Sequence, residues 1–343
     1  MSTTPRTKNT ARTTRNPRGL RRSLSSRLLI TATSAAIVLL AGADQAAAAE
    51  SKSLCVFDPG GASGDLFVKM QQYQNQAATW GVSLDLKAYT DESVAASDFR
   101  NKKCDAVLLT GVTGKEFNRK TYSLEAMGLF TSYAGLKTAI AVLAKPKAIK
   151  FNKQGDFETV GIYPGGAVYL HLNDKKLSSL SALSGRSVAT IAGDRAAMTM
   201  VKEVGATPQS AQISNFASKF NNGGVDIVYS PATAYQPLEL YKGVGKGGGV
   251  VRFPIAQLTF QIFIRSDEFP AGFGDQSRAY VSGQFGMMLD VIKRAESTIT
   301  SWIDVDAGAR ANYKALLATV RSQLVSEKVY NPAVIKLGER IGK

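Results

Sequence analysis

Residues 181–232 read SALSGRSVATIAGDRAAMTMVKEVGATPQSAQISNFASKFNNGGVDIVYSPA, and strand patterns alternate with helix patterns along them. The apolar run at residues 187–191 predicts a strand that leads into a polar turn. A helix follows with apolar residues spaced along one face, and Gly205 ends it. A second helix, at residues 213–220, precedes another apolar strand at 225–229. This alternation predicts a parallel α/β sheet, in which ligands gather at the carboxyl ends of the strands.

The chain after residue 53 shows the same alternation. Residues 54–57, 83–88 and 104–109 predict strands, and helix patterns between them run to Trp80 and Phe99. This β-α-β-α-β order predicts half of a doubly wound sheet. The glycine-rich turn at residues 58–65 lacks both the GxGxxG spacing and a P-loop lysine. It therefore fits a ligand-facing turn, or simply a tight turn at a helix start, and not a nucleotide site.

A short internal sequence repeat suggests two similar half-domains. FRNKKCD, at residues 99–105, and FNNGGVD, at 220–226, share the spacing Phe-x-Asn-x-x-x-Asp. Each run ends a predicted helix, makes a turn and starts an apolar strand. We therefore predict two doubly wound α/β lobes that face each other across a cleft.

Two further pairs of strand patterns predict crossings between the lobes. The first pair is 159–163 and 167–172, separated by Pro-Gly-Gly, and the second is 249–253 and 258–264. Residues 124–150 predict helices with a break at 133–135. We assign lobe 1 to residues 50–165, with 250–276 returning to it, lobe 2 to 166–249, and a helical C-terminal segment to 277–343.

Residues 1–49 predict an export signal that is cleaved near Ala49. Residues 1–27 hold eight basic residues and no acidic one, 28–40 are apolar, and four alanines precede Glu50. The apolar core is short for a membrane span of about 20 residues, which argues against an anchor. The run RRSL at 21–24 hints at twin-arginine export, but ordinary secretion fits the weak remainder of that consensus better.

The formal net charge of +15 is carried in large part by this predicted signal. The rest of the excess is scattered, apart from a cluster at Lys145, Lys147, Lys150 and Lys153. No stacking aromatics are interleaved with a basic stripe, so a solvated face is favoured over a nucleic-acid site.

The two cysteines, Cys55 and Cys104, each stand at the start of a predicted strand. Neighbouring parallel strands would bring these ends together, and an exported protein meets oxidising conditions. A disulfide is therefore expected, with two buried thiols as the alternative. There is no CxxC spacing and only one histidine, His171, which argues against a metal or redox site.

Catalytic motifs are missing from the sequence. The nucleophile elbow Gly-x-Ser-x-Gly is absent. His171 is the only imidazole and is interpreted as structural, and pairs of acidic residues are interpreted as surface charge. We therefore expect neither an enzyme nor a cofactor.

Several runs resemble TRAP-type periplasmic solute-binding proteins over most of residues 53–330. They are LSALSGRSV at 180–188, EVGATP at 203–208 and GVD at 224–226. A more specific resemblance is to the AdeT-type solute-binding group, carried by CVFD at 55–58, YTDE at 89–92, NFASKFNNG at 215–223, PLELYKG at 237–243 and RFP at 252–254. The resemblance implies a bilobed periplasmic-binding-protein fold that closes on a small solute and delivers it to a membrane transporter.

One departure from the TRAP-type pattern concerns the solute. Many of these proteins carry an arginine that grips a substrate carboxylate, and alignment on Gly185 places Ala189 at that position. The resemblance therefore leaves the carboxylate clamp in doubt. Arg195 is a candidate replacement, and the alternative is a surface residue beside Asp194.

The turns at the predicted strand ends supply the candidate solute-binding residues. They are Asp58, Ser63, Tyr89, Thr110, Tyr163, Asp194, Arg195, Tyr229 and Gln261. Tyrosines give a pocket both walls and hydroxyl groups. Because acidic residues outnumber arginines near these turns, we expect a solute with a hydroxyl or an amine and not a simple dicarboxylate.

The sequence thus predicts a monomeric periplasmic solute-binding protein whose partners are a small polar solute and the subunits of a membrane transporter. The alternative is an accessory envelope protein of a transport or efflux assembly that binds no small solute itself. Neither hypothesis involves nucleic acid.

Overall fold

The computed structural model describes residues 49–342, so the predicted export signal lies almost entirely outside the described residues. The strands of the described part form one mixed sheet. They are β1 (Glu50–Phe57), β2 (Val82–Tyr89), β3 (Ala106–Thr110), β4 (Lys153–Gln154), β5 (Phe157–Leu172), β6 (Ser187–Ile191), β7 (Thr207–Ala211), β8 (Ile227–Pro231), β9 (Gly249–Val251), β10 (Ala256–Arg265) and β11 (Trp302–Ile303).

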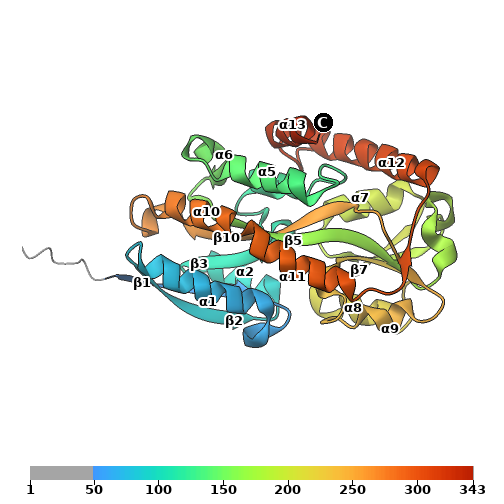
Figure 1. Cartoon of the computed structure of the whole chain (residues 1–343), viewed down its shortest axis with the longest axis horizontal. Helices are drawn as coiled ribbons and strands as arrows, with labels where there is room; N and C mark the ends of the chain where they lie inside the picture. The colour runs from blue at the N-terminus through green and yellow to red at the C-terminus, as the bar shows by residue number, and fades with distance from the viewer. Residues whose placement is uncertain (1–48, 343) are drawn as a thin grey trace, which may run out of the picture. The chain divides into compact units, whose positions relative to one another are not determined.

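Helices cover both faces of this sheet (Figure 1). They are α1 (Asp65–Ala78), α2 (Glu92–Arg100), α3 (Gly111–Gly114), α4 (Arg119–Tyr122), α5 (Tyr133–Leu143), α6 (Ile149–Asn152), α7 (Arg195–Glu203), α8 (Ile213–Asn221), α9 (Leu240–Val244), α10 (Phe273–Gly283), α11 (Phe285–Ser297), α12 (Ala307–Ser326) and α13 (Pro332–Ile341). Two 3-10 turns, η2 (Ser123–Glu125) and η6 (Ala232–Ala234), are used below.

Two α/β units with the same strand order make up the two ends of the sheet. In the first α/β unit, β1 pairs in parallel with β2 on one side and β3 on the other. In the second α/β unit, β6 pairs in parallel with β7 and β8 in the same way. The first strand of each unit is therefore central, as a doubly wound arrangement requires, and the predicted bilobed α/β fold is confirmed.

The covering of β1 on both faces follows from its alternating side chains. Leu54 and Val56 pack in one apolar cluster with α1, while Cys55 and Phe57 pack in another with α2. Successive strand residues point to opposite faces, so a strand covered on both sides must be apolar at every position. This is why residues 54–57 of β1 are recognisable as a short apolar run.

The internal sequence repeat at residues 99–105 and 220–226 corresponds to a repeated set of hydrogen bonds. Asp105 accepts from the backbone N–H and the hydroxyl of Ser53 at 2.6 and 2.8 Å, before β3 and within β1. Asp226 accepts from the same two groups of Ser187 at 2.9 and 2.8 Å, before β8 and within β6. Each aspartate thus ties the start of the third strand of its unit to the central strand.

Long antiparallel strands join the two units. β10 pairs with β3 and β5, and β5 pairs with β8, so the sheet is continuous from one unit to the other. The prediction of two separate strands around Pro164 is wrong, because β5 runs through this proline without a break. A shift of register opposite Leu258 and Thr259, with φ of 115° at Gly166, accommodates the irregular segment.

Two other predictions need correction. The expected helix break at Tyr133 is the start of α5, where the hydroxyl of Ser132 accepts from the Gly135 N–H at 3.3 Å as an N-cap. β7 was not predicted, because this edge strand is mostly exposed and contains Pro208. A strand with little buried surface and a proline carries no apolar signal.

A disulfide joins Cys55 of β1 to Cys104, two residues before β3, with their Cα atoms 5.9 Å apart. Both residues are buried. The expected pairing is therefore present in the structure.

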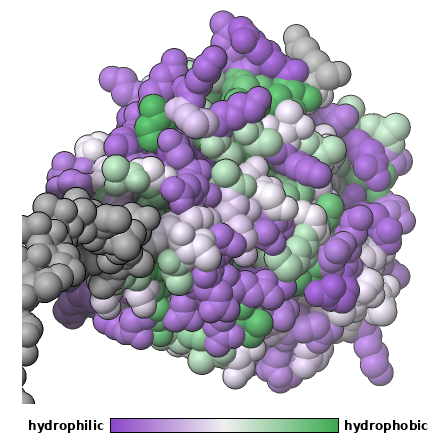
Figure 2. Space-filling view, turned by 60° about the vertical axis from the view of Figure 1, so that its left-hand side comes forward, coloured by the Kyte–Doolittle hydropathy of each residue, from purple (hydrophilic) through white to green (hydrophobic). Residues whose placement is uncertain are grey.

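The C-terminal helices lie outside the sheet (Figure 1). α12 packs on α7 of the second unit, and α13 packs on α5 and η2. The face shown in Figure 2 is mainly hydrophilic, with hydrophobic residues in small separate groups. Among residues 49–342, no helix combines the length and the hydropathy needed to cross a bilayer.

Candidate functional site

A cavity of about 270 Å³ lies where the central strands of both α/β units end. Its lining includes Phe57 at the end of β1, Thr110 at the end of β3, Ile191 at the end of β6 and Tyr229 near the end of β8. In open α/β sheets ligands bind at the carboxyl ends of the strands. The cavity therefore occupies the place that the topology favours for a ligand.

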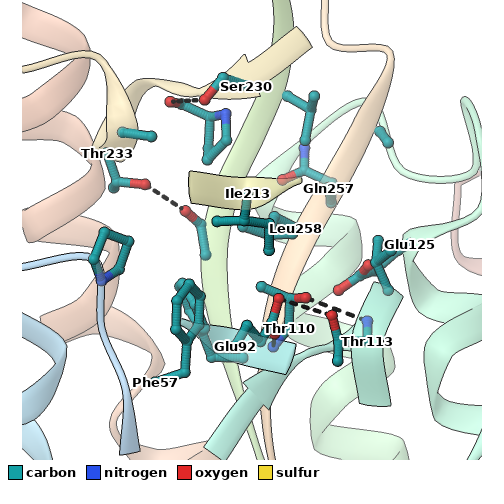
Figure 3. A pocket seen from close by; sticks show the side chains of 18 of the residues that line it. Phe57, Glu92, Thr110, Thr113, Glu125, Ile213, Ser230, Thr233, Gln257 and Leu258 are labelled. Atoms are coloured by element: carbon teal, nitrogen blue, oxygen red, sulfur yellow. Dashed lines mark hydrogen bonds between the residues drawn. The ribbon is translucent and has the colours of Figure 1, made fainter. Parts of the chain in front are cut away.

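Most of the cavity wall is apolar. Side chains from β1, α8, β10 and α11 supply it, namely Phe57, Ile213, Phe216, Leu258, Phe260, Met288 and Ile292. Figure 3 shows Phe57, Ile213 and Leu258 directed toward the same space. Such a wall stabilises a bound molecule by removing its apolar surface from water, at about 25 cal/mol for each Å² buried.

Four of the predicted site residues line the cavity, and three of them, Asp58, Thr110 and Asp194, accept hydrogen bonds from backbone N–H groups at the start of a helix. Asp58 accepts from the backbone N–H groups of Gly60, Leu66 and Phe67 at 2.7, 2.9 and 3.0 Å. It leaves no room for a side chain at Gly64, where a Cβ would lie 2.0 Å from its carboxylate. Asp58 is therefore committed to the start of α1.

Asp194 has the corresponding position in the second α/β unit. Its carboxylate accepts from the Ala197 N–H at 3.0 Å and from the Tyr229 hydroxyl at 2.8 Å. Burial raises the pKa of Tyr229 well above its ordinary value, so its hydroxyl keeps its proton. Asp194, Tyr229 and Thr110 thus bring fixed polar groups to an otherwise apolar wall.

The other five predicted site residues lie away from the cavity lining. The Tyr89 hydroxyl donates to Asp98 at 2.8 Å at the end of the outer strand β2, and Tyr163 is buried in the core beside α1 and α10. Gln261 is buried inside β10 and donates to Thr121 and Thr259.

Ser63 and Arg195 are exposed residues. Ser63 ends a short 3-10 turn ahead of α1. Arg195 forms an ion pair with Glu327 at 2.9 Å, so it ties α7 to the end of α12. Ala189, the position aligned with the carboxylate-gripping arginine, is fully buried in β6.

Sequence reasoning missed two buried carboxyl groups on the cavity floor. Glu92, the first residue of α2, accepts from the Thr110 N–H and from the Thr113 hydroxyl, the latter at 2.8 Å (Figure 3). Both of its oxygens are therefore occupied. Burial raises the pKa of Glu92 above its ordinary value.

Glu125 lies at the end of η2, and only one of its two carboxyl oxygens has hydrogen-bond partners. Its Oε1 accepts from Gly111 N–H at 3.0 Å and from the N–H and hydroxyl of Thr259 at 2.7 and 2.6 Å. Its Oε2 is buried and has no hydrogen-bond partner. Burial raises the pKa of this carboxyl from 4.5 to about 8. A buried polar oxygen without a partner is costly, so Glu125 Oε2 is the atom of the floor that most needs one.

The ionisable residues of the described lining include acids but no basic side chains. Five carboxyl residues line the cavity, namely Asp58, Asp65, Glu92, Glu125 and Asp194, and the lining residues of the described chain include no lysine, arginine or histidine. A carboxylate ligand would therefore meet like charges and no cationic partner.

One cross-link spans the two units near this site. The Lys115 ammonium, just after α3, donates to the backbone carbonyl of Gly193 at 2.6 Å, in the turn between β6 and α7. The same ammonium lies 5.8 Å from the ring centre of Tyr122, which lines the cavity. Lys115 therefore joins the two units beside the cavity.

Metal-binding geometry is not found among the described residues. Within residues 49–342 no cluster of three or more histidine, cysteine, aspartate or glutamate side chains is arranged to hold an ion.

Comparison with known proteins gives a family and a fold. Residues 78–342 match the family described as solute-binding protein AdeT 1/2. The chain is 37% identical over 288 residues to the probable solute-binding protein AdeT1 of Acinetobacter baumannii, which covers 83% of this chain and 95% of the relative.

Solved structures of TRAP periplasmic solute-binding proteins share the fold. One from Desulfovibrio salexigens with bound orotic acid has a TM-score of 0.70 and 12% identity, covering 85% of this chain and 98% of that one. Another from Shewanella oneidensis with bound succinate has a TM-score of 0.67 and 10% identity, covering 86% and 100%. At such low identity the likeness extends to the fold alone.

Proposed function

This chain belongs to the family of AdeT 1/2 solute-binding proteins, and we propose that it captures a small solute without a carboxylate and delivers it to a membrane transporter. Solute binding, as opposed to catalysis, is the role that the family membership gives it. The proposal adds the class of the solute and the place where it binds.

The observation that carries the proposal is an apolar cavity at the strand ends whose described lining has carboxyl groups and no cationic side chain. Orotic acid and succinate, which the two solved TRAP proteins hold, are both acids. A buried carboxylate is stable only with a cation or several donors around it. The cavity of this chain instead suits a neutral or cationic solute.

The proposed contact residues come from both ends of the sheet. From the sequence-based set we keep Asp58, Thr110, Asp194 and Tyr229, of which Thr110 and Tyr229 face the solute and the two aspartates hold the helix starts. We add Phe57, Phe216, Leu258, Glu125 and Gln257, which also line the cavity.

Domain closure is part of the proposal. For the two lobes the proposal keeps the predicted bounds, residues 50–165 with 250–276 and residues 166–249. Each lobe contributes to the cavity lining, so their separation opens it to solute. The protein acts as a periplasmic monomer after removal of residues 1–49, and the closed form docks on the transporter.

Native mass spectrometry of the mature protein purified from its own cell envelope tests this function. We expect a complex heavier than the polypeptide, and release of a small molecule without a carboxylate on denaturation. A polypeptide mass alone, together with no thermal stabilisation by any member of a broad metabolite panel, would favour the accessory envelope protein instead.

A pair of variants locates the binding. Ala234→Trp places a large ring at a residue of η6 that lines the cavity, and it should abolish the mass increment. Ala78→Trp, at an exposed position at the end of α1, is the matched control and should keep it. Retention of the solute by Ala234→Trp would place the site elsewhere.

A further inference from the structure

Two buried oxygen atoms of the cavity lack a hydrogen-bond partner. They are Glu125 Oε2 and Gln257 Oε1, and each belongs to a cavity-lining residue that is 5% or less exposed. The amide nitrogen of Gln257 points to the Phe130 carbonyl, which fixes the amide oxygen as the free atom. Gln257 Oε1 can only accept, and Glu125 Oε2 becomes an acceptor once its carboxyl has lost its proton, so a cationic donor that takes the place of this proton would satisfy both atoms.

The side chains of Glu125 and Gln257 are both tied to strand β10. Glu125 Oε1 is held by the N–H and the hydroxyl of Thr259 on β10. Gln257 stands two residues earlier on the same strand and so projects from the same face as Thr259. In Figure 3 the Gln257 side chain lies above Leu258, and the Glu125 carboxyl lies to the right of Leu258, on the side of Thr113.

From this arrangement we infer that the solute is an organic amine, with its protonated nitrogen between Glu125 Oε2 and Gln257 Oε1 and its apolar body against Phe57, Phe216 and Phe260. The inference rests on the proposed function and names its substrate class. An ammonium carries up to three N–H donors, which allows it to satisfy both acceptors, whereas a hydroxyl carries one.

The charge of the floor favours a cation over a neutral donor. Glu92 already uses both oxygens, Asp58 and Asp194 cap helices, and Asp65 is exposed, so Glu125 is the buried carboxyl with an oxygen left for a ligand. A cation beside a buried carboxyl favours its charged form. Binding therefore converts Glu125 from its protonated to its ionised form and releases one proton.

The opposite wall determines what the rest of the solute is made of. Phe57 from β1, Phe216 from α8 and Phe260 from β10 lie among other apolar residues. The volume of about 270 Å³ suits a compact body of one or two rings or a branched alkyl group. A highly hydroxylated amine would leave polar groups unpaired against this wall.

Matched series of compounds test the inference on the mature wild-type protein. Phenylethyl, cyclohexylmethyl and naphthylmethyl bodies are each tested as the primary amine, the alcohol and the carboxylic acid by calorimetry at pH 7. We expect at least one amine to bind at least tenfold more tightly than its alcohol, with no binding of the acids. An alcohol or acid that equals its amine, or a series in which no amine binds, overturns the inference.

A variant and a proton measurement identify the recognising group. Glu125→Gln should lower amine affinity at least tenfold and leave alcohol affinity within twofold, while Glu116→Gln, an exposed partner of Arg100, should change neither. Calorimetry of the wild type in two buffers of different ionisation enthalpy should show release of close to one proton at pH 7. This measurement needs no variant, so it decides the inference if Glu125→Gln fails to fold.

Other ionisable groups around the cavity could also contribute to the number of protons released on binding. They are Asp58, Asp65, Glu92, Asp194, Tyr122, Tyr229 and Tyr330. Zero proton release on amine binding would overturn the role of Glu125. Binding of a neutral solute would overturn the amine inference and leave solute capture standing, whereas an empty protein that no compound stabilises contradicts solute capture itself.

Discussion

Glu92 and Glu125 accept hydrogen bonds from two consecutive backbone amides, those of Thr110 and Gly111, at the end of β3. The two carboxyl groups come from different elements, α2 and η2, and meet under the cavity. Burial raises the pKa of both, and the charge of Glu92 adds to the rise at Glu125. This close approach of two buried acids gives the protein a specific dependence on pH.

The first prediction concerns Glu125 and the free energy of unfolding. Its pKa is raised from 4.5 to about 8, so the folded state holds this proton more tightly than the unfolded chain does. Its contribution to stability is fully present below pH 4.5 and is lost as the pH rises to 8. Glu125→Gln, which does not titrate, should therefore gain stability relative to wild type over this range, by a few kcal/mol and at most about 5 kcal/mol.

Urea unfolding of both proteins at pH 5 and pH 8.5 measures this effect. Glu116→Gln is the control, because this carboxyl is partly exposed and pairs with Arg100 at the surface. An equal difference between Glu125→Gln and wild type at the two pH values would contradict the assignment.

The second prediction concerns His171, which has the opposite dependence. Its Nε2 lies 3.1 Å from the Ser230 carbonyl and must donate to it, and burial lowers its pKa from 6.5 to about 4. The unfolded chain then binds a proton that the folded state does not, so stability is present above pH 6.5 and is lost as the pH falls to 4. The full loss is about 3 kcal/mol.

Replacement by glutamine separates the titration from the hydrogen bond. The amide of His171→Gln can donate to the same carbonyl, but it does not change charge in this range. We expect its unfolding free energy to vary less between pH 6.5 and pH 4 than that of wild type. Parallel pH curves for the two proteins would show that another group causes the acid dependence.

The third prediction concerns the disulfide between Cys55 and Cys104, which are 49 residues apart. Closing a loop of this length removes conformational entropy from the unfolded chain, equivalent to about 4 kcal/mol at 25 °C. Reduction should lower the unfolding free energy by an amount of this order. Cys55→Ala with Cys104→Ala serves as the comparison, and this double variant should be insensitive to reductant, whereas a wild type that is equally insensitive would contradict a stabilising bond.

Much of the fold could be predicted because its central strands are buried on both faces. The strand at residues 187–191 was placed at its observed bounds, and the sequence repeat ending in Asp105 and Asp226 corresponds to real hydrogen bonds to Ser53 and Ser187. β7 escaped prediction because it is exposed. Burial, and not strand formation itself, gives the signal that a sequence carries.

The candidate site was less predictable because strand order is not visible in the sequence. Tyr89 ends a strand as Thr110 does, but β2 is at the edge of the sheet and β3 lies inside it. Glu125 and Gln257 come from η2 and β10, which reach the cavity only through tertiary packing. The sequence did contain a feature that points to Glu92. This residue follows a predicted strand, as the other candidate site residues do, and it lies next to the helix cap Asp91.

The last prediction concerns the contact of Lys115 with the Gly193 carbonyl, at 2.6 Å, which joins the two α/β units beside the cavity. If the closed form holds the solute, loss of this charged hydrogen bond should speed opening. A net value of about 1 kcal/mol for such a bond at a half-exposed position corresponds to roughly a fivefold faster dissociation. Lys115→Met keeps the aliphatic stem and removes the donor.

Stopped-flow displacement of a bound amine from the panel measures the dissociation rate. Lys137→Met removes an exposed lysine of α5 that is not part of the cavity lining, so its rate should equal that of wild type. The association rate should change little in either variant, because in the proposed closure the solute enters while the two units are apart. A dissociation rate unaffected by Lys115→Met would mean that the cavity wall, and not this cross-link, limits solute release.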